Sequence, residues 1–422
     1  MGTDGSSIWK RDPERQITQL WSTSGRLKDP FSNIMKRIAY IIESPIQYHV
    51  SLFKSLNERE DMSVMVMYMS RRGVEPVYDE DKGFMVDWDI PVLEGYEHVF
   101  LETLPFHDDE KGGFWDRANY GLSNTLRAGD FDAVILHGYQ YYTNIAALGA
   151  CKSAGIPVFM RGESEDFFYR PLRKKAARDA FVWMLKKTLD AALYIGTENK
   201  KFYLDHGFSE DRLFHVPYCV DNERFNPKKR EQVSVRDQLG IGEDEVLFVT
   251  ASKHRQDRYV SDVIEAFSQL PDGGDGSLVL LGDGPVRAEL ESEAANSPRR
   301  DDIHFTGMID QSEYPSYLAA SDVLVHPSSE TWGCAINEAI SSGLAVLSSD
   351  EVLGWPDMVT PGVNGFVYPF RDTQALSEQM ARLARNPSET RHMKTESRRI
   401  AEALDFELCG ENIRKAVEQY GR

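Results

Sequence analysis

Short apolar runs alternate with amphipathic stretches along most of the chain. The apolar runs that predict buried strands in the first half are at residues 37–43, 64–69, 132–138, 157–163 and 191–197. Helical spacing predicts a helix at about 48–56, between the first two strands. Strands that alternate with helices form a parallel, doubly wound sheet, so an α/β domain is predicted that closes with residues 215–221.

A second series of strands follows a polar, charged stretch at 222–245, which contains Pro227 and is predicted to be the domain linker. The apolar runs of this series are at residues 246–251, 278–284, 303–307, 323–325 and 345–347. A final helix is predicted at about 407–420. Residues 1–35 show little periodicity and predict an N-terminal extension. The fold class predicted is therefore α/β, with two Rossmann-like domains at 36–225 and 226–400.

Charge and hydropathy exclude several classes of function. The 422 residues include 48 Lys and Arg against 67 Asp and Glu, a formal net charge of −19. Nucleic-acid binding needs a basic face that neutralises phosphates, so no nucleic-acid partner is predicted. No stretch approaches the roughly 20 apolar residues that span a bilayer, and the N-terminus lacks a signal-peptide core, so an integral membrane protein is not predicted.

The four cysteines, at 151, 219, 334 and 409, show neither a CxxC pair nor metal-ligand spacing, which indicates a reducing cytoplasm. The Asp-x-Asp pattern that some transferases use to hold a metal occurs at 79–81, 87–89 and 130–132. Three matches in so acidic a chain carry no weight, and no metal site is predicted.

One basic amphipathic stretch, residues 170–188, contrasts with the acidic remainder. It predicts either a helix with a solvated basic face over a core stripe, or a helix that contacts an anionic membrane or an acidic acceptor. The second interpretation would place a cytoplasmic protein at the inner membrane face.

Residues 326–343 predict a strand, a turn and a helix. An apolar run ends at Val325, a turn follows at 327–329, and apolar positions then recur at helical spacing up to Gly343, which suits a C-cap. The amides at the positive end of this helix belong to Gly333, Cys334 and Ala335. An anion such as a diphosphate is stabilised at such an end.

Two carboxylates flank these amides, Glu330 on the loop and Glu338 about two helical turns later. Like charge makes both unsuited to phosphate. An ionised carboxylate does accept hydrogen bonds from a diol, so a sugar on one side of a diphosphate and a ribose on the other would satisfy both.

Other candidate residues follow strands, where ligands bind in open α/β sheets. Lys253 and Arg258 follow the first strand of the second half, and fixed cations there would take up charge on a departing diphosphate. In the first half, His137, Arg161 and Glu163 end two strands. A histidine at such an end is either structural or catalytic, and the position leaves both open.

Several motifs together resemble one family. Glu330, seven residues, Glu338 and the run at 342–348 resemble the carboxylate-pair motif of the family-4 retaining glycosyltransferases, which have the GT-B fold. Leu281-Gly-Asp-Gly-Pro285, Phe305-Thr-Gly307, 355–357 and 362–367 also match, so that the resemblance covers about residues 245–370.

The resemblance implies a nucleotide-diphosphate sugar as donor and no cofactor. By this resemblance Glu330 contacts the donor sugar, Glu338 the ribose, and backbone near Met308 the base. Lys253 and Arg258 occupy the phosphate-binding positions with the two residue types exchanged, and His137 lies where the family has a His near the reacting carbon. The resemblance also implies that residues 401–422 form a helix that crosses back to the first domain.

The first half departs from the family pattern, because the loop at 45–49 lacks the glycine pair that many members carry. The acceptor is therefore left open between a saccharide, a lipid-linked saccharide, a small metabolite and a protein. Two other functions are also left open, a nucleotide-sugar epimerase of similar fold and a non-catalytic sugar-nucleotide binding protein.

Overall fold

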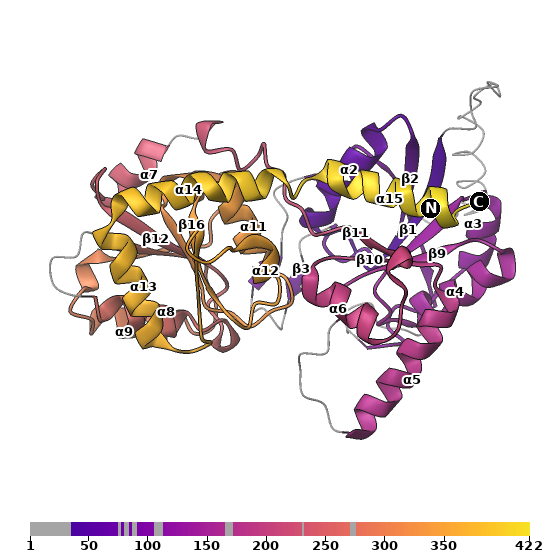
Figure 1. The fold of residues 1–422 in the computed structure, drawn as a ribbon, viewed down its shortest axis with the longest axis horizontal. Coiled ribbons are helices and arrows are strands. Elements are labelled where there is room, and N and C mark those ends of the chain that lie inside the picture. Colours follow the sequence, from indigo (N-terminus) through magenta and orange to yellow (C-terminus); the bar gives the residue numbers. More distant parts are fainter. Residues whose placement is uncertain are drawn as a thin grey trace, which may run out of the picture.

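The computed structural model describes residues 35–74, 77–79, 84–86, 91–104, 113–164, 172–229, 232–270 and 276–422. The predicted extension at 1–35, except Met35, and the 87–89 Asp-x-Asp match lie outside these residues. The described chain forms two α/β lobes, one from each half of the sequence (Figure 1).

Seven parallel strands form the sheet of the first lobe, in the order β11-β10-β9-β8-β1-β2-β5. The strands are β1 (Lys36–Ile42), β2 (Met62–Tyr68), β5 (Glu97–Phe100), β8 (Ala133–His137), β9 (Val158–Arg161), β10 (Ala191–Tyr194) and β11 (Leu213–His215). Two antiparallel pairs lie outside this sheet: β3 (Val77–Asp79) with β4 (Phe84–Val86), and β6 (Glu102–Thr103) with β7 (Asn119–Tyr120).

Helices cover both faces of the first sheet, which explains the continuous apolar runs of its strands. The helices are α2 (Gln47–Glu58), α3 (Leu122–Ala128), α4 (Tyr142–Ala154), α5 (Leu172–Thr188), α6 (Thr197–Asp205) and the C-terminal α15 (Phe406–Tyr420). Ile38, Tyr40 and Ile42 of β1 pack with α2 and α15, whereas Ala39 and Ile41 point to the face covered by α3 to α6.

Six parallel strands form the second sheet, in the order β14-β13-β12-β15-β16-β17. They are β12 (Val246–Ala251), β13 (Gly276–Leu281), β14 (Ile303–Gly307), β15 (Val323–His326), β16 (Ala345–Ser349) and β17 (Gly365–Tyr368). The helices around it are α7 (Gln232–Leu239), α8 (Val260–Ser268), α9 (Arg287–Ala295), α10 (Tyr314–Ala320), α11 (Cys334–Ser341), α12 (Trp355–Met358), α13 (Thr373–Arg385) and α14 (Pro387–Glu402). Short 3-10 turns are η1 (Glu210–Arg212), η2 (Pro227–Lys229), η3 (Gln256–Arg258) and η4 (Arg300–Asp302).

The chain passes between the lobes twice. One passage follows β11, and the other lies between α14 on the second lobe and α15, which runs beside α2 on the first (Figure 1). Cys219, after β11, lies with its Sγ 3.5 Å from the Sγ of Cys409 in the first turn of α15, and both thiols are free. Cysteines that are 190 positions apart in sequence are therefore neighbours in the fold.

The predicted α/β class with two parallel, doubly wound sheets is confirmed. Three local expectations were wrong or incomplete. The polar 222–245 stretch contains the helix α7, the closing segment predicted at 215–221 is preceded by the last strand of the sheet, β11, which ends at His215, and β5 extends the first sheet where no strand was predicted. Among the described residues, no helix combines the length and the apolar character needed to cross a bilayer.

Candidate active site

The loop from β15 to α11 turns at Gly333, which caps the N-terminus of α11 with a φ of +91°. A side chain here would be strained by that φ and would meet Val352 Cγ1 at 3.0 Å. At the other end, the C-cap is Ser342, and Gly343 follows it with a φ of +74°. The predicted strand, turn and helix are therefore present, with glycine where left-handed backbone is needed.

The first turn of α11 holds the predicted anion-binding amides. In the described part of the chain, no acceptor receives a hydrogen bond from the amides of Gly333, Cys334 or Ala335. Helix geometry leaves these donors without an intrahelical partner, and they carry the positive end of the helix dipole. An anion in contact with this turn would satisfy them.

Glu330 is held on both carboxylate oxygens. Oε1 lies 2.6 Å from His326 Nε2, and Oε2 accepts a hydrogen bond from Arg258 Nη1 at 2.7 Å. Burial alone would raise the pKa of this carboxyl, but His326 and Arg258 lower it to about 2. Glu330 is therefore ionised at neutral pH and fixed in orientation.

Glu338 lies in the opposite electrostatic environment. The residue is buried, and its Oε2 accepts one hydrogen bond, from the Tyr314 hydroxyl at 2.9 Å. Burial raises its pKa to about 7, although the Tyr314 hydrogen bond and the charge of Arg224 act in the other direction. Two carboxylates eight positions apart are thus held in different protonation equilibria.

A pocket beside Glu338 is shared by the two lobes. Its lining residues are Gln47, Tyr48 and Ser51 of α2, the 219–221 segment, Arg224, Phe225 and Glu338. Tyr48 and Glu338 line this pocket together, and Glu338 raises the pKa of the Tyr48 phenol well above its usual value. Glu338 therefore faces the first lobe.

The loop after β12 brings a predicted cation to the carboxylate pair. Arg258, in η3, is the ion-pair partner of Glu330. Lys253 lies half-buried earlier in the same loop, while Arg255 pairs with Asp257 instead.

Gly282 and Gly284 allow the loop after β12 to pack closely, because a Cβ at either would come within 2.4 Å of a backbone oxygen of Ser252 or His254. Met308, predicted near the base, is 56% exposed directly after β14.

His137, at the end of β8, lies in a cluster of aromatic and basic side chains. Its Nδ1 is 3.0 Å from the Tyr40 hydroxyl and its Nε2 is 3.3 Å from the Tyr218 hydroxyl. Burial, with the charge of Arg161, lowers the His137 pKa to about 3. The imidazole is therefore neutral at physiological pH, and tyrosines occupy both of its nitrogens.

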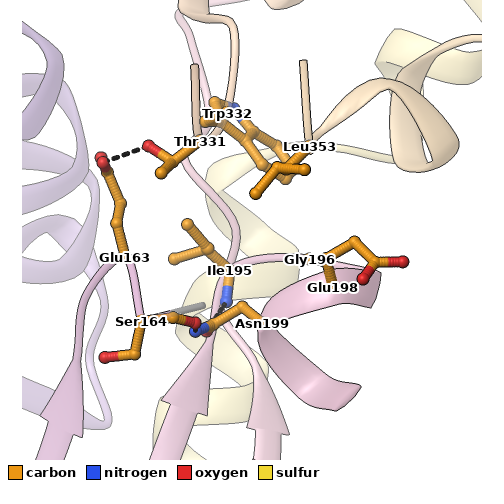
Figure 2. Close-up of a pocket in the computed structure, with 9 residues that line it drawn as sticks. All are labelled: Glu163, Ser164, Ile195, Gly196, Glu198, Asn199, Thr331, Trp332 and Leu353. Carbon is orange, nitrogen blue, oxygen red and sulfur yellow. Dashed lines mark hydrogen bonds between the residues drawn. The ribbon is translucent and has the colours of Figure 1, made fainter. Parts of the chain in front are cut away.

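A second pocket is also lined by residues of both lobes, and Figure 2 shows its lining side chains. The residues are Glu163, Ser164, Ile195, Gly196, Glu198, Asn199, Thr331, Trp332 and Leu353. Thr331 donates a hydrogen bond to the Glu163 carboxylate across the pocket. Asp357 further ties the lobes, accepting from the Thr197 amide at 2.9 Å and from its hydroxyl at 2.8 Å.

The structure thus pairs Arg258 with Glu330. Along the chain, the α11 amides lie between Glu330 and Glu338. His137 lies on the other lobe, behind Tyr218, whose ring centroid is 6.3 Å from that of Trp332. Within the described residues, no group of three or more His, Cys, Asp or Glu is arranged to hold a metal.

The sequence analysis did not identify the residues that form hydrogen bonds with the candidate site residues Glu330, Glu338 and His137. His326 could have been found, because it ends a buried strand as His137 does. Tyr40, Tyr218 and Tyr314 gave no signal, since they are far in sequence from the groups that they contact.

Comparison with known proteins finds a family model and several relatives that resemble this chain. A model described as glycosyl transferases group 1 matches residues 232–400. N-acetyl-alpha-D-glucosaminyl L-malate synthase of Bacillus anthracis is 28% identical over 193 residues, which is 46% of this chain and 48% of that protein. Alpha-monoglucosyldiacylglycerol synthase of Streptococcus pneumoniae is 27% identical over 349 residues, 79% of this chain and 76% of that protein.

The match spans about half the length of the first relative and three quarters of the second. Among solved structures, Anabaena HepE in complex with UDP superposes with a TM-score of 0.70 at 15% identity, over 91% of this chain and 100% of that chain. At this identity the likeness shows the fold. Residues 232–400 are therefore similar to the glycosyl transferases group 1 family, and the two lobes have the GT-B fold.

Proposed function

We propose that this protein is a retaining glycosyltransferase, which moves a sugar from a nucleoside-diphosphate sugar to a hydroxyl acceptor without a metal. The observation that carries the proposal is the ionised Glu330, paired with Arg258 and followed by the helix amides of α11. The match of residues 232–400 to the glycosyl transferases group 1 model and the relatives named as synthases support a transferase over an epimerase or a silent binding protein.

The donor would bind mainly to the second lobe. Its diphosphate would accept hydrogen bonds from the amides of Gly333, Cys334 and Ala335 and receive charge from Lys253 and Arg258. Glu338 would accept from the ribose hydroxyls, Glu330 from the sugar, and backbone near Met308 would contact the base. An ionised carboxylate can accept two hydrogen bonds from a diol, which suits both assignments.

Transfer would take place on one face of the sugar. The leaving phosphate would remove the proton of the acceptor hydroxyl, and the residues of both lobes would exclude water from the reacting carbon. His137 would support the sugar or the acceptor hydroxyl from the first lobe, and it would do so through Tyr218, because tyrosines occupy both of its nitrogens. Arg258 is already paired with Glu330, so we expect the geometry of this ion pair to change when the diphosphate of the donor binds to Arg258.

The acceptor would be a hydroxyl compound that reaches the site from the first lobe. A relative whose name includes a diacylglycerol makes lipids worth testing as acceptors. α5, within the basic stretch 170–188, would then be the element in contact with an anionic membrane. Flotation with vesicles containing phosphatidylglycerol, compared with neutral vesicles, would test that contact.

The first experiment is thermal stabilisation by a panel of nucleoside diphosphates and nucleotide sugars, with and without EDTA. A ligand that binds the folded state raises apparent stability with its occupancy. We expect one base to stabilise selectively, with no effect of EDTA, and Glu338→Ala to reduce the shift. The control is Glu378→Ala, an exposed glutamate of α13. A panel without any response would contradict the donor site and favour a scaffold.

Conversion of the selected donor would separate the remaining alternatives. A transferase should hydrolyse it slowly without acceptor and faster with one, whereas an epimerase would interconvert it without any acceptor.

A further inference from the structure

The first lobe contains a buried cation, Arg161, that no carboxylate among the described residues pairs with. Arg161 is 1% exposed, and its hydrogen bonds go to neutral oxygens. Its Nε donates to the Val216 carbonyl at 2.9 Å and its Nη2 to the Pro217 carbonyl at 2.6 Å. Burying a guanidinium is costly unless its donors are satisfied, so the position needs a reason beyond packing.

The remaining guanidinium nitrogen of Arg161, Nη1, begins a chain of hydrogen bonds. Nη1 donates to the Tyr40 hydroxyl at 3.2 Å, and that hydroxyl lies 3.0 Å from His137 Nδ1. His137 and Arg161 are register partners on β8 and β9, so their side chains leave the sheet on the same side.

The direction of the chain follows from donor and acceptor chemistry. Arg161 only donates, so the Tyr40 oxygen accepts from it. Tyr40 is fully buried, and its hydroxyl hydrogen would be unsatisfied if His137 Nδ1 also donated to it. An unsatisfied buried donor costs about 1–3 kcal/mol. Tyr40 therefore donates to Nδ1, which leaves the proton of neutral His137 on Nε2.

The same logic continues to the surface between the lobes. Nε2–H donates to the Tyr218 oxygen at 3.3 Å, so the Tyr218 hydroxyl hydrogen is directed away from the cluster. Burial raises the pKa of the Tyr218 phenol well above its usual value, and Glu163 and Cys334, the first residue of α11, act in the same direction. The Tyr218 carbonyl accepts from Asn337 Nδ2 of α11 at 2.6 Å, which fixes Tyr218 beside the helix with the free amides.

We propose that the Arg161–Tyr40–His137 chain orients Tyr218 as a hydrogen-bond donor to an oxygen of the bound sugar diphosphate. Tyr218 touches the substrate, and His137 is a positioning residue that acts through it. The ligand side of this proposal rests on the proposed function, whereas the direction of the chain does not.

Nitrogen NMR of the protein labelled with ¹⁵N-histidine tests the chain without substrate. We expect His137 to carry its proton on Nε2 across pH 6–8, and Tyr40→Phe to give a mixture of tautomers. A proton on Nδ1, a charged ring, or a tautomer unchanged in Tyr40→Phe would overturn the proposal. A merely structural cluster would not make the tautomer depend on one hydroxyl.

Donor affinity tests the ligand end. We expect Tyr218→Phe to weaken binding of the sugar nucleotide selected by the thermal panel about fivefold to tenfold. Tyr420→Phe is the matched control, because it also removes a hydroxyl hydrogen bond, to Asp211, far from the site. Equal affinity of wild type and Tyr218→Phe would overturn Tyr218 as a donor. If no nucleotide binds, the proposed function fails, and the tautomer measurement still decides the chain.

Discussion

Glu330 and Glu338 have the same side chain and are only eight positions apart, yet the structure gives them opposite properties. Glu330 is ionised because His326 and Arg258 compensate for its burial, whereas Glu338 is buried against a neutral hydroxyl. Their pKa values, about 2 and about 7, follow from these partners. The motif therefore determines where the two carboxylates lie in the sequence, whereas residues outside the motif, such as Arg258 and Tyr314, determine whether each carboxylate is protonated.

Removing the charge of Glu330 should have the largest effect. Glu330→Gln keeps the shape but leaves His326 and Arg258 without an anion, and a sugar contact made by a fixed charge is lost. We expect the rate of transfer to fall about 10²- to 10³-fold, the range seen when one stabilising group is removed from an active site. The measurement is release of nucleoside diphosphate from the selected donor. A rate within a few-fold of Glu378→Gln would contradict the role of Glu330.

The pH dependence of stability should separate the two carboxylates. Because the Glu338 pKa rises from 4.5 to about 7 on folding, the folded state holds that proton more tightly, and the free energy of unfolding should fall as pH rises from 4.5 to 7. The full shift corresponds to about 3 kcal/mol. Urea unfolding of wild type and Glu338→Gln between pH 4.5 and 8 measures it, and we expect this fall to be absent in the variant.

Glu330 should have the opposite effect on the pH dependence of the free energy of unfolding. Its pKa is lowered on folding, so its contribution is present above pH 4.5 and is lost as pH falls towards 2. Glu330→Gln should therefore weaken the acid dependence below pH 4.5 and leave the fall between pH 4.5 and 7 intact. If both variants changed the same pH range, the comparison would be wrong.

The next largest effect should be a loss of nucleotide affinity when Glu338 is replaced. Hydrogen bonds to a charged group contribute about 1.5–3 kcal/mol, so we expect Glu338→Ala to weaken binding of the preferred nucleoside diphosphate about 10- to 100-fold. Calorimetry in buffers of different ionisation enthalpy adds a second readout. Ribose hydroxyls that donate to the carboxylate favour its ionised form, so binding to wild type near pH 6.5 should release protons and binding to the variant should not.

The second lobe could be predicted well because its chemistry is local in sequence. The strand, turn and helix at 326–343, the two carboxylates and the glycines of 281–285 are each set by neighbours within about ten residues. Arg258 required only the rule that loops after parallel strands meet at one edge of the sheet.

The first lobe could not be predicted to the same depth because its site is built from distant positions. Tyr40, His137, Arg161 and Tyr218 come from β1, β8, β9 and the passage between the lobes, and no spacing links them. The sequence placed His137 at a strand end, yet the partners that hold both of its nitrogens appear only when strands pair. The same holds for Cys219 and Cys409, which two separate chain passages bring together.

The smallest effect expected concerns the exchange of Arg and Lys at the phosphate positions. Arg258→Lys keeps a positive charge beside Glu330, but an ammonium lacks the planar fork that orients a guanidinium against a carboxylate or a phosphate. We expect a loss of about tenfold in transfer rate, or about 1.4 kcal/mol, with little change in nucleotide affinity. The double variant Lys253→Arg/Arg258→Lys restores the arrangement of the resembled family and should recover part of the rate. Full activity of Arg258→Lys alone would mean that only the charge at this position matters, and that Glu330 is oriented by His326.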